Sequence, residues 1–160
     1  MKIISGGQTG VDIAALEVAK ELGLETGGWM PPGWITQIGA KPHYETLYSL
    51  KEHPEDGYKP RTWQNVSDSD ATIRLAFNLN SPGEICTLNA IKHYKKPFFD
   101  VDMANPIAPD VVFQFLLENK VSILNVAGNS EKSAQGIYFE AKDYLKKLFE
   151  LIKNYENSTN

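Results

Sequence analysis

The stretch KIISGGQTG at residues 2–10 decides the fold of this chain, because a short apolar strand runs into a glycine-rich turn. A stretch with helical spacing follows from Val11 to Leu22, in which Ala14 and Val18 share one face. Backbone amides and the positive end of the helix would then meet at one place where a phosphate can bind. The glycine spacing matches neither the dinucleotide fingerprint nor a P-loop. An ordinary strand-to-helix turn is therefore an alternative interpretation.

Length, charge and cysteine content narrow the class of protein. A chain of 160 residues is expected to form one domain with one core. Its net charge is −4 and no basic cluster occurs, so nucleic acid is not expected as a partner. Cys86 is the only cysteine, which is typical of a reducing compartment. No signal-peptide pattern and no apolar run of membrane-spanning length occur, so we expect a cytoplasmic protein without a membrane partner.

Strands and helices are expected to alternate along the chain. Strands are expected at residues 3–4, 24–29, 71–77, 98–101 and 122–127, and helices lie between and after them. This alternation predicts an α/β fold with a mainly parallel sheet and helices on both faces. We expect a single domain over residues 1–156 and a frayed tail at 157–160.

Residues 30–68 show no clear periodicity, although they contain five prolines and, with Trp29 at the edge, all three tryptophans. The aromatic content argues against disorder. We therefore expect an ordered flap at about residues 30–68 that folds over the sheet edge, with room for short helical turns. Its tryptophans could stack on a flat heterocycle or pack as a local core.

Polar turns follow several of the expected strands, at residues 5–10, 78–83 and 128–136. Ligands of parallel α/β sheets bind outside the carboxyl ends of the strands. The convergence of these turns therefore predicts a ligand site at that edge of the sheet.

Arginine is scarce in this chain, where only Arg61 and Arg74 occur. A guanidinium group binds phosphate or carboxylate with two parallel hydrogen bonds. Arg61, in the flap, is expected to bind an anion or to form a salt bridge with Asp68 or Asp70. Arg74 lies in the middle of a strand, which favours a structural role. Asp68 and Asp70 could act as an acid–base pair, but the sequence offers no reacting partner for them.

Two further turns could contribute to the site. Ser81-Pro82-Gly83-Glu84 begins a helix and is either a second anion site or an ordinary helix start with an acidic first turn. Gly128-Asn129-Ser130-Glu131 could bind polar atoms of a ligand or only turn the chain.

No catalytic or metal-binding motif is evident. His43, His53 and His93 have no metal-ligand spacing, so no protein-ligated metal is expected. No Gly-x-Ser-x-Gly elbow or Cys-His pairing occurs, and we assign no catalytic residue.

Taken together, these segments resemble the molybdenum cofactor carrier protein family. The resemblance rests on Gly6-Gly7-Gln8-Thr9-Gly10-Val11-Asp12, on Arg61-Thr62 with Asn65-Val66 and Asp68-Ser69-Asp70-Ala71-Thr72, and on Leu124-Asn125-Val126-Ala127-Gly128. It extends from the first strand to the last helix. This family is similar to a wider group of Rossmann-like proteins that includes the lysine decarboxylase-like phosphoribohydrolases.

The resemblance implies a Rossmann-like three-layer α/β/α fold, a homo-oligomer (dimer or tetramer), and binding of molybdopterin cofactor or a related nucleotide-like molecule. A molybdoenzyme would be the recipient. The implied ligand-binding residues are Gly6, Gly7, Gln8, Thr9, Gly10, Arg61, Asn65, Asp68, Ser69, Asp70, Ser81, Gly83, Thr87, Gly128 and Ser130. The chain departs from the family pattern at Ile13, where arginine is usual, and in the turn at residues 81–87.

Three functions follow as hypotheses. The leading one is a non-catalytic carrier that holds a phosphate-bearing pterin-type ligand at the carboxyl edge of the sheet. The second is a nucleotide-processing enzyme of the phosphoribohydrolase type, although Thr87 and Leu88 stand where that group has an acidic residue. The third is a nucleotide-sensing or scaffold protein whose glycine-rich turns serve the fold alone.

Overall fold

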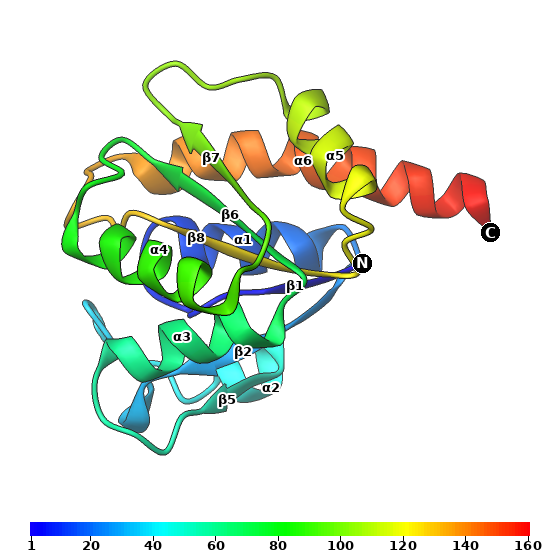
Figure 1. Cartoon of the computed structure of the whole chain (residues 1–160). Coiled ribbons are helices and arrows are strands. Elements are labelled where there is room, and N and C mark those ends of the chain that lie inside the picture. Colours follow the sequence, from blue (N-terminus) through cyan, green and yellow to red (C-terminus); the bar gives the residue numbers. More distant parts are fainter.

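Six parallel strands form the central sheet, in the order β5–β2–β1–β8–β6–β7. The structure is a computed structural model that describes all residues, 1–160. The strands are β1 (Lys2–Ile4), β2 (Glu25–Met30), β5 (Leu50–Glu52), β6 (Ala71–Ala76), β7 (Phe98–Asp102) and β8 (Ile123–Gly128). A separate antiparallel hairpin pairs β3 (Ile35–Thr36) with β4 (Gly39–Ala40). Figure 1 colours the chain by its position in the sequence and labels the strands of the central sheet.

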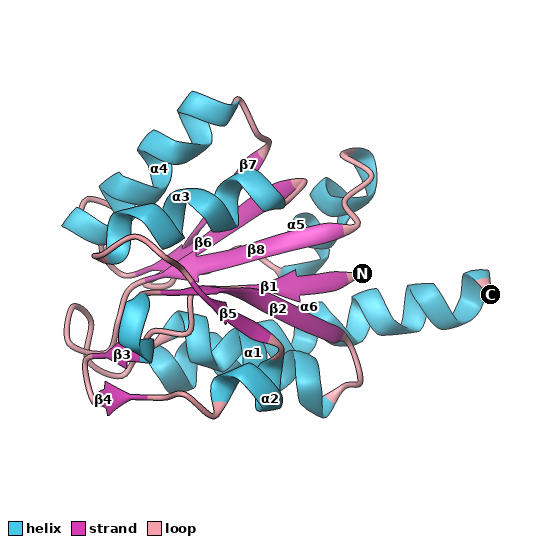
Figure 2. Ribbon diagram, turned by 90° about the horizontal axis from the view of Figure 1, so that it is seen from below, coloured by secondary structure: helices cyan, strands magenta, loops and turns pink.

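Helices cover both faces of the sheet, so the molecule has three layers (Figure 2). One face carries α1 (Val11–Glu21), α2 (Tyr44–Tyr48), α5 (Pro109–Glu118) and α6 (Ile137–Thr159), and the other carries α3 (Tyr58–Asp68) and α4 (Pro82–Tyr94). The α/β class and the mainly parallel sheet predicted from the sequence are confirmed.

The two faces of the sheet differ in polarity. Successive side chains of a strand point to opposite faces, and in β6 the apolar and polar residues alternate. Ile73 and Leu75 of β6 join the main apolar core under α1, α5 and α6. Thr72 and Arg74 of the same strand are also buried but belong to no apolar cluster. The apolar cluster under α3 and α4 contains only three buried residues. The sheet surface under these two helices therefore leaves room for polar groups.

The segment 30–68 is more regular than its sequence pattern predicts. It contains a 3₁₀ turn at Pro32–Trp34, the β3–β4 hairpin, α2, β5 and α3. Arg61 consequently lies on a helix of 11 residues rather than in a loop. At the other end of the chain, residues 157–159 continue α6, where the sequence predicts a frayed tail at 157–160.

The carboxyl ends of the strands lie at the end of the sheet near the β3–β4 hairpin, far from both chain termini (Figure 2). β1 pairs with β2 on one side and β8 on the other, and the helices that follow β1 and β8 cover the same face. The opposite face at this edge is covered by the beginning of α4 and by α3. The space between these elements holds the candidate site.

Candidate ligand site

A cavity of about 280 Å³ lies at the carboxyl ends of β1, β6 and β8, on the side of α3 and α4. Its walls come from five regions that are far apart in the sequence, one of which is the turn of the β3–β4 hairpin at Gln37. They include Gly6, Gln8 and Asp12 of the first strand–helix unit, Tyr58, Arg61 and Asn65 of α3, Ser81 to Glu84, Cys86 and Thr87 of α4, and Asn125 to Ser130 of β8 and its turn.

Nine of the fifteen ligand-binding residues implied by the resemblance line this cavity. They are Gly6, Gln8, Arg61, Asn65, Ser81, Gly83, Thr87, Gly128 and Ser130. Gly7, Thr9 and Gly10 instead line a neighbouring groove beside α1 and α6. The glycine-rich turn at residues 6–10 therefore contributes some residues to the cavity and others to the groove beside α1 and α6.

The remaining three implied residues lie away from the cavity. Asp70 accepts hydrogen bonds from the Ser122 and Ile123 amides at 2.9 and 2.8 Å, at the amino end of β8. Asp68 accepts one from the Trp29 indole N–H at 2.8 Å. The Ser69 hydroxyl donates to a backbone carbonyl of α3. These contacts lie within the protein, away from the cavity, and Arg61 pairs with neither Asp68 nor Asp70.

Several amides of the glycine-rich turn and of the start of α1 already have partners within the protein. Gln8 N–H donates to the Asp12 carboxylate at 3.2 Å, and Thr9 N–H donates to the Gln8 side chain at 2.9 Å. Val11 N–H donates to the Asn129 carbonyl. The Asp12 carboxylate thus occupies a position at the start of α1 where a bound anion would be favoured. Burial raises the pKa of Asp12 above its ordinary value, and the Arg61 guanidinium opposes that shift.

Arg61 is the one cationic side chain that lines the cavity. Its side chain is only 12 % exposed, its Nη1 lies 3.5 Å from the Asp12 carboxylate, and its Nε is buried without a hydrogen-bond partner. The guanidinium lies directly against Gly6, where an added Cβ would be 1.7 Å from Nη1. Tyr58 lies beneath it, with the ring centroid 5.6 Å from Cζ. Because guanidinium groups bind oxyanions with directed pairs of hydrogen bonds, this arrangement favours anion binding.

The first turn of α4 also faces the cavity. No side chain caps it and Pro82 at its first position has no N–H, so the Gly83 and Glu84 amides have neither a capping partner nor a partner within the helix. Ser81, at the N-cap position, accepts a hydrogen bond from the Asn129 side chain at 3.3 Å instead. These amides add a second set of donors for an anion.

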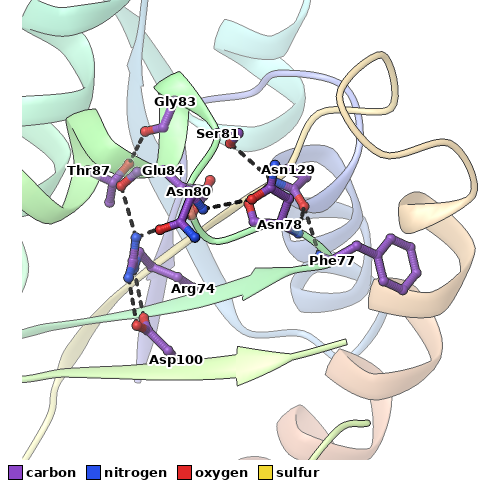
Figure 3. Close-up of polar contacts among 10 residues, drawn as sticks. All are labelled: Arg74, Phe77, Asn78, Asn80, Ser81, Gly83, Glu84, Thr87, Asp100 and Asn129. Atoms are coloured by element: carbon purple, nitrogen blue, oxygen red, sulfur yellow. Dashed lines mark hydrogen bonds and ion pairs between the residues drawn. The ribbon is translucent and has the colours of Figure 1, made fainter. Parts of the chain in front are cut away.

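Asn129 fixes the loop that leads into α4 (Figure 3). Its side-chain oxygen accepts hydrogen bonds from the Phe77 and Asn78 amides at 2.8 and 3.1 Å, and its Nδ2 donates to the Asn78 carbonyl at 3.0 Å. The residue is 2 % exposed. One buried amide thereby ties the end of β6 to the end of β8.

Glu84 is a buried carboxyl group in the cavity wall, and no hydrogen bond to its Oε2 is present. Arg74 Nη1 lies 3.8 Å from that oxygen. Arg74 donates instead to both oxygens of Asp100, at 2.7 and 2.6 Å, and to the Glu84 backbone carbonyl at 2.9 Å (Figure 3). Arg74 is therefore structural, as its mid-strand position predicts. Burial raises the pKa of Glu84 to about 7.

The sequence interpretation did not name several polar side chains of this cavity as site residues, among them Asp12, Glu84, Asn125 and Cys86. The available signal was a polar residue inside an apolar pattern, as with Asn125 in the middle of β8 and Asp12 in the first turn of α1. Burial raises the pKa of the Cys86 thiol, which keeps it protonated near neutral pH and makes it a poor nucleophile.

The three tryptophans pack locally and none lines the cavity. Trp63 packs against Val66, Ala90 and Ile91, and Trp34 packs beside Met30 and Leu50. No group of three or more His, Cys, Asp or Glu side chains is arranged to hold a metal ion. None of the helices combines the length and the apolar character that crossing a bilayer requires.

The fold defines a Rossmann-like α/β protein with a polar cavity at the carboxyl edge of its sheet. The chain belongs to the circularly permutated YpsA SLOG family, whose model matches residues 3–149. It is similar to a solved structure from Syntrophus aciditrophicus SB, named Putative molybdenum carrier protein, with 34 % identity and a TM-score of 0.82. That match covers 92 % of this chain and 93 % of the other. No curated protein matches the chain.

Proposed function

We propose that this chain binds a small phosphate-bearing ligand of the pterin type in the cavity and holds it without converting it. The observation that carries the proposal is the Arg61 guanidinium, which faces the cavity nearly buried and with its Nε unpartnered. A buried guanidinium without hydrogen bonds is costly, and an oxyanion would supply the missing acceptors. The uncapped first turn of α4 offers further donors beside it.

The ligand class is inferred from the family and from the name of the similar structure, which refers to molybdenum carriage. We infer that the ligand is molybdenum cofactor, that the chain acts as a homo-oligomer, and that a molybdoenzyme is the recipient. A carrier needs a site that binds and shields its ligand, and it needs no nucleophile. The protonated Cys86 thiol fits that role.

The direct test is a titration of the purified protein with intact molybdenum cofactor under anaerobic conditions, with AMP and GMP as parallel ligands. We expect saturable binding of the cofactor and weaker binding of the nucleotides. Arg61→Ala should weaken cofactor binding by at least about tenfold, because it removes a charged pair of donors. Lys59→Ala is the matched control, since it removes a cation from the same helix outside the cavity. Equal affinity of Arg61→Ala and the wild type would refute the proposal.

A second candidate, a nucleotide hydrolase of the phosphoribohydrolase type, is favoured by one observation. The sequence has no acidic residue where that group has one, yet Glu84 brings a buried carboxyl group to the cavity wall. Such a group could protonate a leaving base while water adds to the sugar carbon. Incubation with nucleoside monophosphates should release free base if this candidate is right, and no release would exclude it.

A further inference from the structure

We propose that ligand binding in this cavity is coupled to protonation of Glu84. The cavity takes up its anionic ligand while Glu84 is in the neutral acid form, so a proton is bound together with the anion above neutral pH. This inference rests on the proposed function, because it concerns the same anion site.

The first step is the absence of a committed partner for the Glu84 side chain. The residue is 2 % exposed and its Oε2 accepts no hydrogen bond. The nearest cation, Arg74, directs two nitrogens to the carboxylate of Asp100 and Nη1 to the Glu84 main-chain oxygen. The fold therefore buries a carboxyl group without giving its charged form a strong hydrogen-bond donor.

The second step is the charge balance of the elements around Glu84. β6 supplies Arg74, β7 supplies Asp100, α1 supplies Asp12 and α3 supplies Arg61. β8 supplies the uncharged Asn125, and α4 itself supplies the Cys86 thiol.

Each arginine faces one aspartate, so Arg74, whose Nη1 lies 3.8 Å from Glu84 Oε2, balances a charged Glu84 only in part. Burial nevertheless raises the pKa of Glu84 to about 7, because the opposing effect of Arg74 is smaller and both aspartates add to the rise.

The third step is the effect of an anion in the cavity. A dianion near Arg61 and the first turn of α4 adds negative charge to a space whose wall contains the Glu84 carboxyl group. Like charges in a partly buried site repel strongly, and protonation of Glu84 removes the repulsion. The coupling is reciprocal, because a proton on Glu84 must favour the anion as much as the anion favours the proton.

The test uses sulfate as the probe, since sulfate does not titrate near neutral pH, whereas a phosphate monoester has a second pKa of about 6. Calorimetric titrations of the wild-type protein are run at about pH 6 and about pH 8, in two buffers with different heats of ionisation. We expect the affinity at the higher pH to be about tenfold lower, with uptake of about one proton per sulfate.

Two variants identify the group that takes up the proton. Glu84→Gln keeps the shape and removes the charge, so it should bind sulfate with the same affinity at both pH values and take up no proton. Asp12→Asn should still show weaker sulfate binding as the pH rises, with the midpoint shifted to lower pH because it removes one of the charges that raise the pKa of Glu84. Glu140→Gln, at an exposed position on α6, is the control for a general loss of negative charge.

The outcomes separate this inference from the proposed function. Sulfate binding that weakens with pH in the wild type and not in Glu84→Gln supports the coupling. Sulfate binding without pH dependence or proton uptake overturns the coupling and leaves the anion site standing. A flat profile in Asp12→Asn instead of Glu84→Gln overturns the assignment to Glu84. No binding of sulfate, GMP or molybdenum cofactor at either pH overturns the proposed function itself.

Because wild-type proton uptake needs no variant, the test does not depend on the folding of Glu84→Gln.

Discussion

Replacing Glu84 with glutamine should change how the stability of the free protein depends on pH. The pKa of Glu84 rises from an ordinary value of 4.5 to about 7 in the folded state, because the carboxyl group is buried. The folded state therefore binds its proton more tightly than the unfolded chain does. This contribution to stability is fully present below the unfolded pKa and is lost as the pH rises through the folded pKa. At one pKa unit per 1.36 kcal/mol, the loss is about 3 kcal/mol.

The side-chain amide of the Glu84→Gln variant has no proton to lose, so that variant escapes this loss. We expect the free energy of unfolding of Glu84→Gln, relative to the wild type, to increase by about 3 kcal/mol between about pH 4.5 and about pH 8. Urea denaturation of both proteins at a series of pH values measures this difference, and shared titrations cancel in it.

The sign of the change distinguishes two physical pictures. If Arg74 held Glu84 as a charged partner, its pKa would fall, and the variant would lose stability relative to the wild type as the pH rises. A pH-independent difference would also refute the reasoning, because it would mean that Glu84 titrates alike in the folded and unfolded states. Glu140→Gln serves as the exposed control and should show no such trend.

Three further changes have expected outcomes. Gly6→Ala places a Cβ 1.7 Å from Nη1 of Arg61, so it should displace the guanidinium and weaken GMP binding in calorimetry by about as much as Arg61→Ala, roughly tenfold; unchanged affinity would show that the guanidinium position is unimportant. Asn129→Ala removes four hydrogen bonds that fix the loop before α4 and should cost about 3 kcal/mol in urea denaturation. Asp70→Ala removes the acceptor for two amides at the start of β8 and should cost about 1–2 kcal/mol. Asp70→Ala should leave the affinity for GMP unchanged, and a loss of affinity would show that Asp70 contributes to ligand binding.

The fold class could be predicted because the main core is periodic in the sequence. Apolar residues at helical spacing in α1 and α6, and short apolar runs in β6 and β8, mark elements that bury a whole face. The helix α3 gave no such signal. Only Asn65 and Val66 of its residues are buried, and Pro60 argues against a helix unless it lies in the first turn, as it does here.

The candidate site was predicted in part for a similar reason. Arg61 and the turns after the strands stand out because their residue types and their places after strands are visible in the sequence. Glu84 does not stand out, because an acidic residue in the first turn of a helix is ordinary. The burial of Glu84 depends on how α4 packs over β6. Its side chain lacks a hydrogen-bond partner because Arg74 donates to Asp100 instead. Neither feature can be read from the residues that neighbour Glu84 in the sequence.

The two arginines have different roles: Arg74 stabilises the structure, whereas Arg61 is available to bind a ligand. Arg74 has a bidentate contact with Asp100 and a backbone acceptor, so its guanidinium has little left to offer a ligand. Arg61 is held by packing against Gly6 and by a longer 3.5 Å contact with Asp12, which itself takes a hydrogen bond from the Gln8 amide. Packing fixes the position of the Arg61 guanidinium while part of its hydrogen-bonding capacity stays unused. Such a group is preorganised, and the free energy of its missing hydrogen bonds is recovered only when an anion binds.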